Sequence, residues 1–538
     1  MRPRPWKWDA WLLVACIVAA GLASIQMGQD MNWDLQNYHY YNPWAWLAGR
    51  IYTTDIVAAQ LQTYHNPLPD IPFYLLVKWG FRPRTIAFLL AVPAGIAAFL
   101  LLKLLTVLFR DVPLRERWLS VGAALVISLT SAMATAVLGT TMNEWPGTAL
   151  TIAGVFLVVR ALALAPDAPI SRMTLLAAGL LCGFATGAKL TFGVYAVGLC
   201  AAILLRGPWR RAHLRRAFVE AFTFGVAVLA GTAVTGGPWM WALWTHFRNP
   251  IFPYANIWFK SPWWGEYEVM GRPYGPHRLV EWLVFPFTLA SPPPFYVTEQ
   301  TYTDARLPVL YGVALLAGAA WIGKCIAASR RGGRAAIARI AGIPAAWRVT
   351  GIFWIVSFLI WTAQYSIYRY LVPLELLSGA LLVALLRYLL RPDTAGPAIV
   401  VVGALLVATT TPPDWWRGEF GRRWFDVKVP YVAPNALVLL TTDGPMAYVL
   451  PFFPADARHF GLNNNINDPK RDTLMEESIA HAIRVHKGPL YSLTYPAGAG
   501  ADVLAAHRLL HFPEHCREIR TNMRTSPIEL CLLTRFPP

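Results

Sequence analysis

Long apolar runs alternate with short polar connections over most of the chain. About eleven of these runs approach the roughly 20 residues that a helix needs to cross a bilayer. A twelfth run, 281–290, is too short to span, so we expect it at the membrane interface. The pattern predicts an α-helical polytopic membrane protein with about eleven transmembrane helices, at 11–27, 85–109, 118–138, 147–164, 173–187, 190–205, 218–234, 307–325, 349–365, 370–390 and 398–410.

Hydropathy falls after residue 411, and shorter apolar runs follow at 436–442, 488–496 and 528–535. Turn-rich segments separate these runs, which is typical of strands with intervening helices. We therefore divide the chain into a transmembrane module, 1–411, and a small C-terminal α/β domain, 412–538. The transmembrane module carries two large polar loops, 29–84 and 236–306.

Composition supports a membrane protein, since 56% of the residues are hydrophobic and 14% are charged. The net charge of +17 does not indicate nucleic-acid binding, because the basic residues form short clusters between apolar runs, as in cytoplasmic loops. No A-x-A-like cleavage site follows the first run, so we expect a retained helix. Basic clusters favour the cytoplasmic side of a membrane. The clusters in this chain therefore predict a protein of the bacterial inner membrane with its N-terminus in the cytoplasm and its C-terminal domain in the periplasm. They comprise Arg2, Arg4, Lys7, Arg110, Arg115, Arg117, Arg206, Arg210, Arg211, Arg215, Arg216, Lys324, Arg330, Arg331, Arg334, Arg339, Arg348, Arg387 and Arg391.

The segment 29–50, after the first run, is the densest polar and aromatic stretch of the chain. It contains Asp30, Asp34 and His39, and we expect part of it to form an aromatic helix along the interface. On a helix the two carboxylates would share a face, and a fixed carboxylate can accept a proton from an alcohol. The alternative is that Asp34 caps a solvated helix.

Five further polar residues fall on the same predicted outer side. His65 and Asp70 lie in a proline-broken loop, and His65 suits a phosphate or a structural hydrogen bond. Glu144 is either a second carboxylate of the site or a helix-start residue. Lys189, at the tip of a tight helical hairpin, and Arg369, between two apolar runs, either bind a lipid phosphate or reach the headgroups.

The loop 236–306 is rich in tryptophan, proline and tyrosine, so we expect it to lie on the membrane surface. It serves either as an aromatic belt or as a platform for lipid or sugar. In the C-terminal domain, Cys516 and Cys531 lie on two predicted strands joined by a turn near 525–527. In an oxidising compartment they can form a disulfide, which requires Cα atoms within about 7 Å.

Several function classes have no support. We find no P-loop, dinucleotide turn or zinc-type Cys/His cluster. Carboxylates within the apolar runs are nearly absent apart from Glu375, which argues against a proton-coupled transporter.

The residues at the polar segment resemble the first outer loop of the GT-C superfamily of polytopic glycosyltransferases, which includes protein O-mannosyltransferases and the aminoarabinose transferases of lipid A. In those enzymes an acidic residue is followed by tyrosine four positions later and by glycine about fifteen later. Asp34, Tyr38 and Gly49 have this register. The resemblance implies that Asp34 is the base that acts on the acceptor hydroxyl.

Two more motifs resemble the same superfamily. One family motif is a Gly-rich helix that ends in Leu-Thr-Lys, and the helix that ends at Lys189 is similar to it. The other is Arg-Tyr followed by proline, which Arg369, Tyr370 and Pro373 resemble. The chain departs from the family at 65–68, where many relatives have Lys-Pro-Pro-Leu and this chain has His-Asn-Pro-Leu. It also has Leu35 where relatives have a second carboxylate. Because that lysine is missing, the resemblance assigns the phosphate contact to His65, Lys189 or Arg369.

The resemblance implies an inverting glycosyltransferase that moves a hexose or pentose from a polyprenyl-phosphate donor to a glycan, lipid or protein acceptor on the extracytoplasmic side. Neither a metal nor another cofactor is expected, because lysine and arginine can neutralise the leaving phosphate. The candidate catalytic residues are Asp34, Asp30 and Glu144. The candidate substrate-binding residues are Tyr38, His39, His65, Asp70, Lys189, Arg369 and Tyr370. A lipid-diphosphate-dependent O-antigen ligase or polymerase, a flippase of lipid-linked sugars and a structural protein remain alternatives.

Overall fold

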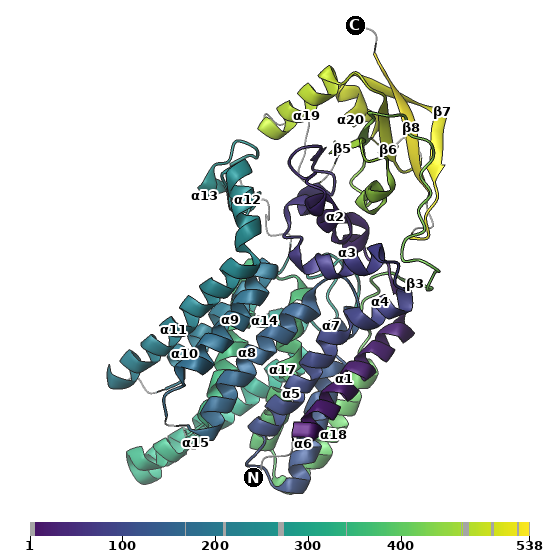
Figure 1. Cartoon of the computed structure of the whole chain (residues 1–538). Helices are drawn as coiled ribbons and strands as arrows, with labels where there is room; N and C mark the ends of the chain where they lie inside the picture. The colour runs from purple at the N-terminus through teal and green to yellow at the C-terminus, as the bar shows by residue number, and fades with distance from the viewer. Residues whose placement is uncertain are drawn as a thin grey trace.

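The computed structural model describes residues 6–166, 168–207, 211–266, 274–340, 342–463, 465, 473–496, 500–523 and 527–536. A bundle of long helices carries a smaller sheet domain on one end, and α1 (Trp6–Met27) begins at the opposite end of the bundle (Figure 1). The first polar loop lies between the two parts. Arg2, Arg4 and Arg210 of the predicted charge pattern, and residues 524–526 of the predicted turn, lie outside the described residues.

Within these residues, eight helical segments are long and apolar enough to cross a membrane. The fold class predicted from the apolar runs is therefore confirmed, whereas the count of eleven stays a prediction. Two shorter apolar helices, α9 (Arg172–Ala188) and α10 (Gly193–Leu205), lie among the longer ones. The eight segments are Trp8–Met27, Pro83–Leu108, Glu144–Leu164, His213–Thr235, Arg306–Arg330, Ala345–Gln364, Tyr368–Leu389 and Pro392–Thr409.

Apart from the two large polar loops, which follow α1 and α11 (Arg211–Thr235), short connections join the helices of the bundle. These helices are α4 (Pro83–Leu90), α5 (Val92–Leu108), α6 (Leu114–Leu129), α7 (Ala132–Ala136), α8 (Glu144–Leu164), α15 (Arg306–Ile340), α16 (Ala345–Gln364), α17 (Val372–Leu389) and α18 (Pro392–Thr409), together with α1, α9, α10 and α11.

The prediction of one helix over 118–138 is wrong beyond Leu129, where α6 ends. A short separate helix, α7, follows. Buried carboxylates bind its first backbone amides: Ala132 N donates to Asp304 Oδ2 at 2.9 Å, and Ala134 N donates to Glu375 Oε2 at 3.0 Å. Such charged bonds satisfy amides that a continuous helix would have used internally, so they stabilise a new helix start.

The small residues before Lys189 let α9 approach α11 closely. A Cβ atom on Gly183 would lie 2.3 Å from the carbonyl oxygen of Val228, and one on Gly187 would lie 2.6 Å from that of Thr232. Glycine at these two positions allows backbone contact between the helices. The close packing predicted for this segment is confirmed, although its tightest contacts are with α11.

The C-terminal domain contains a mixed six-stranded sheet of order β2-β5-β4-β6-β8-β7. The three predicted strands are confirmed as β4 (Leu437–Leu440), β6 (Leu490–Thr494) and β8 (Ile528–Arg535). Strand β4 lies parallel to β5 and β6, and β8 pairs antiparallel with β6 and β7. The remaining elements are β5 (Arg458–Gly461), β7 (Leu509–Ile519), α19 (Leu474–Val485) and α20 (Ala501–Ala506).

The first polar loop contributes the edge strand β2 (Asp55–Ile56), which pairs parallel with β5. Asp55 is buried and accepts hydrogen bonds from Arg50 Nη2 at 2.8 Å, Tyr41 Oη at 2.9 Å and His459 N at 3.1 Å. We call Tyr41, Arg50, Asp55 and His459 the anchor cluster. It attaches the loop to the sheet domain through residues that are far apart in the chain. Asp55 and His459 are separated by 404 positions.

The aromatic segment after Asp34 differs from its prediction. Instead of one helix along the interface it forms a π-helical turn, η1 (Leu35–His39), and a short helix, α2 (Tyr41–Leu47). Tyr41 and Ala45 are fully buried in the core shared with the C-terminal domain. Gly49, with φ of +67°, ends the segment in the left-handed conformation that favours glycine.

The second polar loop forms three short helices, α12 (Gly237–Phe247), α13 (Asn256–Phe259) and α14 (Leu279–Thr288). Some of its aromatic side chains enter the core, including Trp239 and Trp264, whereas Trp241 and Trp258 are exposed. Its two interpretations, belt or platform, stay predictions.

Cys516 and Cys531 form a disulfide between β7 and β8, and their Cα atoms lie 3.9 Å apart. The predicted pairing and the limit on the Cα distance are confirmed. The two strands are antiparallel and place these cysteines directly opposite each other.

Candidate active site

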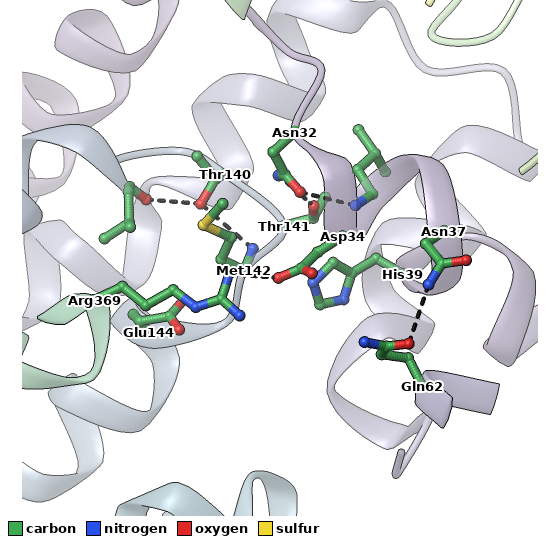
Figure 2. Close-up of polar contacts among 12 residues, drawn as sticks. Asn32, Asp34, Asn37, His39, Gln62, Thr140, Thr141, Met142, Glu144 and Arg369 are labelled. Carbon is green, nitrogen blue, oxygen red and sulfur yellow. Dashed lines mark hydrogen bonds and ion pairs between the residues drawn. The ribbon is translucent and has the colours of Figure 1, made fainter. Parts of the chain in front are cut away.

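Four turns of the chain meet at the end of the bundle that faces the sheet domain (Figure 1). Asp34 precedes η1, Glu144 begins α8, Lys189 follows α9, and Arg369 lies in the 3-10 turn η5 (Tyr368–Leu371) before α17. Figure 2 shows the side chains of Asp34, Glu144 and Arg369 close together. The structure therefore assembles residues that are far apart in sequence. Asp34 and Arg369, for example, are separated by 335 positions.

Asp34 forms an ion pair with Arg369, in which Nη1 donates to Oδ2 at 2.7 Å. Both side chains are largely buried. Burial alone would raise the pKa of Asp34, but the positive charge of Arg369, helped by Lys189, outweighs it and holds that pKa below its ordinary value. Asp34 is therefore an ionised carboxylate at neutral pH in a site of low polarity.

Lys189 supplies a second cation. Its Nζ donates to the carbonyl oxygen of Met142 at 2.8 Å and forms an ion pair with Glu144 Oε1. The ring of Tyr370 lies beside both cations, with Lys189 Nζ 5.0 Å and Arg369 Cζ 5.4 Å from its centroid. An aromatic face at this distance stabilises a cation and keeps it in place.

Asp30 lies away from this charge cluster, although it had been expected to share a helix face with Asp34. It lies in the short strand β1 (Gln29–Asp30), which pairs with β3 (Arg417–Gly418). Its carboxylate accepts hydrogen bonds from Asn32 Nδ2 at 2.7 Å and from Thr141 N at 2.8 Å. These bonds hold the segment before Asp34 against the segment before Glu144.

His39, Asp70 and Asn143 form a buried chain of hydrogen bonds. His39 Nδ1 lies 2.7 Å from Asp70 Oδ1, and Asn143 Nδ2 donates to the same oxygen at 2.6 Å. Asn143 has a left-handed backbone, with φ of 66°. This conformation is costly for a residue other than glycine, so the surrounding contacts must hold it.

The proline-broken loop places His65 and Asn66 nearby. His65 Nε2 lies 2.9 Å from Tyr254 Oη, and its ring packs edge-on to Tyr38, with centroids 5.2 Å apart. Burial lowers the pKa of His65 to about 4, so it is neutral at pH 7. Asn66 Nδ2 donates to the carbonyl oxygens of Gly187 and Thr235, both at 2.9 Å, and so ties the loop to α9 and α11.

A polar cluster deeper in the bundle supports the segment that leads to Glu144. Arg306 is buried and donates to Asp304 Oδ1 at 2.9 Å and to the carbonyl oxygens of Ile127 at 2.6 Å and Thr130 at 2.7 Å. Glu375 accepts from Ser131 Oγ at 3.0 Å. Because these groups are within the bundle, they fix the start of α7 and hence the path of the chain to the site.

Sequence reasoning missed Met142 and Asn143. Met142 acts through its backbone carbonyl, which no side-chain pattern can reveal. Asn143 is next to the predicted Glu144, and its only sequence signal is that asparagine tolerates the left-handed region better than most residues.

The site combines the carboxylates of Asp34 and Glu144 with two cations, Lys189 and Arg369. Such a set can accept a proton at Asp34 and stabilise a developing anion at Lys189 and Arg369. Among the described residues, a further close group of potential metal ligands is Cys516, Glu529 and Cys531, but its two cysteines are joined in the disulfide.

No family model matches the chain, and no curated protein is significantly similar to it in sequence. Among solved structures, the chain is similar to ArnT from Cupriavidus metallidurans in the apo state, with 13% identity, a TM-score of 0.48 and 97% of each chain covered. The ArnT structure bound to undecaprenyl phosphate has 16% identity and a TM-score of 0.42, with 75% of this chain and 64% of that chain covered, less than two thirds of its length.

A third similar structure is the Archaeoglobus fulgidus oligosaccharyltransferase tethered with an acceptor peptide, with 12% identity and a TM-score of 0.45. That match covers 91% of this chain and 69% of the other. With TM-scores below 0.5, these similarities carry no weight in the functional argument, which therefore depends on the site.

Proposed function

We propose that this protein is an integral membrane glycosyltransferase that moves a sugar from a polyprenyl-phosphate donor to a hydroxyl acceptor. The observation that carries the proposal is the buried pair of Asp34 and Arg369 beside Lys189, at the end of a membrane-spanning bundle. An ionised carboxylate and two cations at that depth suit a substrate whose phosphate is attached to a lipid.

In this mechanism the acceptor oxygen attacks the anomeric carbon and its proton passes to Asp34. The bond between that carbon and the phosphate oxygen breaks, and its electron pair leaves with the lipid phosphate. Lys189 and Arg369 stabilise the charge that develops there. One displacement of this kind inverts the anomeric centre. The acceptor is a hydroxyl of a glycan, lipid or protein, and the sugar is a hexose or a pentose.

Five of the other predicted residues have supporting roles in this proposal. Glu144 fixes the position of Lys189 as its counter-ion, and Asp30 fixes the two chain segments that carry Asp34 and Glu144. Tyr370 holds both cations, while Tyr38 and His65 form one wall of the site. Neither metal nor another cofactor has a part in it.

We place the site on the periplasmic side of a bacterial inner membrane, with the N-terminus in the cytoplasm. Two features support this orientation. The Cys516–Cys531 disulfide is in the domain next to the site, and disulfides persist in oxidising compartments. Clusters of basic residues lie at the opposite ends of the helices, for example Arg110 after α5 and Arg115 in the first turn of α6.

The test uses the purified chain in lipid vesicles with synthetic polyprenyl-phosphate sugars and a panel of hydroxyl acceptors. Transfer that requires Asp34 and yields an inverted product supports the proposal. Donor use only as a polyprenyl diphosphate favours the O-antigen ligase or polymerase alternative. Movement of the lipid-linked sugar between leaflets without transfer favours a flippase.

A further inference from the structure

His39 has one ring nitrogen engaged and the other without a protein partner. The residue is 2% exposed, and its Nδ1 is bound to Asp70, whereas its buried Nε2 has no hydrogen-bond partner among the described residues. A buried polar atom without a partner destabilises the folded protein. That His39 Nε2 lies inside a charged site without a protein partner points to a ligand group that forms the missing hydrogen bond.

The contacts at Asp70 determine which ring nitrogen carries the proton. A carboxylate can only accept, so the ring donates its Nδ1 hydrogen to Asp70 Oδ1. Asn143 donates to the same oxygen and fixes the carboxylate from the other side. In the neutral ring, Nε2 then has a free lone pair and acts as an acceptor.

The π-helical turn decides where this acceptor lies. His39 is the fifth residue after Asp34 and the last residue of η1. The wider turn of a π-helix, with i to i+5 hydrogen bonds, brings the fifth residue closer to the face of the first than a turn of 3.6 residues would. In Figure 2 the imidazole of His39 lies beside the carboxylate of Asp34, and Arg369 approaches that carboxylate from the other side.

We propose that His39 Nε2 accepts a hydrogen bond from a hydroxyl group of the bound sugar or of the attacking acceptor. Asp70 and Asn143 are positioning residues that hold the ring hydrogen at Nδ1, so that the acceptor of the neutral ring lies at Nε2. The inference rests on the proposed function and adds a hydroxyl-recognising side to the site, opposite the two cations. A phosphate does not suit this position, because an unprotonated Nε2 cannot donate to it and the carboxylates Asp34 and Asp70 repel it.

Two substitutions at the same position separate the two ring nitrogens. Asparagine in His39→Asn places an amide near Nδ1, so it keeps the bond to Asp70 and loses the acceptor at Nε2. Glutamine in His39→Gln reaches the position of Nε2 with an amide oxygen and loses the bond to Asp70. We expect transfer by His39→Asn to fall by about 100-fold. The variant lacks the acceptor at Nε2, so the substrate hydroxyl loses its hydrogen bond in the reacting complex. His39→Gln should recover at least tenfold of that loss.

The substitution Asp70→Asn tests the proton position. When the Asn143 amide turns its oxygen towards the new amide nitrogen, that nitrogen donates both to this oxygen and to His39 Nδ1. The ring hydrogen then moves to Nε2, which converts the acceptor into a donor. We expect a loss of transfer similar to that of His39→Asn. Nitrogen-15 spectra of histidine-labelled protein, with His39 assigned from the His39→Asn spectrum, should show an unprotonated Nε2 in the parent and a protonated one in Asp70→Asn.

Binding of a polyprenyl phosphate without sugar, measured as a rise in melting temperature, serves as the control, because it depends on the cations. It should be the same in the parent and in His39→Asn. His39→Asn within threefold of the parent, or a protonated Nε2 in the parent, overturns the inference and leaves the proposed function standing. A parent protein that transfers no sugar from any donor, while the lipid phosphate still binds, overturns both.

Discussion

Two buried charge clusters lie on opposite sides of the first polar loop, and they differ in how completely their polar atoms are paired. In the anchor cluster, Arg50 donates through Nε, Nη1 and Nη2 to Asp55 and to the carbonyl oxygens of Ala455 and Ala457. In the candidate site, Arg369 Nε and Glu144 Oε2 are atoms of charged groups that are buried without a partner among the described residues, and so is His39 Nε2. In the anchor cluster His459 Nε2 is likewise buried without a partner among these residues, but no such atom belongs to Arg50 or Asp55.

The difference separates stability from function. A buried charge with all its hydrogen bonds made holds two parts of a protein together, and removing one partner is costly. A buried charged group that has donor or acceptor atoms without a partner can still form hydrogen bonds, and a ligand can supply the partners. Polar atoms without partners in a charged site are therefore the physical signature of a place where a polar ligand binds.

The largest expected effect is on catalysis at the site. Asp34→Asn should reduce the transfer rate by about 10² to 10⁴-fold, the usual loss for a positioned base. The new side chain has nearly the same shape and can still accept from Arg369, so the fold should persist. Transfer assays on protein of matched melting temperature measure this effect. A rate within tenfold of the parent would assign the base elsewhere, and Glu144 is the nearest candidate.

The matched change in the anchor cluster should affect stability instead. Asp55→Asn leaves Arg50 and His459 buried without their carboxylate, so we expect a loss of about 3–5 kcal/mol in the attachment of the loop to the sheet domain. Limited proteolysis across 455–461 and thermal melting measure it. Transfer per folded molecule should stay within about threefold of the parent. A selective loss of transfer at unchanged stability would contradict the distinction between the two clusters.

The disulfide should contribute to the stability of the anchored domain and not to the site. The double change of Cys516 and Cys531 to serine should destabilise the domain by roughly 3 kcal/mol, the chain-entropy value for so short a loop. Mass spectrometry of non-reduced peptides should first show the two cysteines linked in the parent. Two alkylatable thiols in freshly isolated protein would remove the support that this bond gives to a periplasmic C-terminal domain.

The smallest expected effect concerns His65 and pH. Its pKa is lowered to about 4 by burial, so the unfolded chain binds this proton at higher pH than the folded protein does. The stability that neutral His65 contributes is present above about pH 6.5 and is lost as the pH falls towards 4. The melting temperature of the parent should therefore drop more steeply than that of His65→Asn over this range. Parallel curves would show that His65 is not held neutral.

Local signals were sufficient for the broad architecture. Apolar runs of spanning length and the fall in hydropathy after residue 411 indicated a helical membrane module and a strand-containing domain. Both patterns arise from burial against lipid or core, which acts on each segment separately. The register of Asp34, Tyr38 and Gly49, with Lys189 and Arg369 further on, indicated which residues to follow.

Only the tertiary structure decided how these residues meet. The sequence does not show that Asp34 pairs with Arg369, that a π-helical turn carries His39 after Asp34, or that Asp30 belongs to a strand. It also does not show that Asp55 supplies an edge strand to a sheet formed by the end of the chain. The physical reason is that ion pairs and strand pairing between distant segments depend on where the chain returns, whereas residue spacing reports only the nearest turns of the same element.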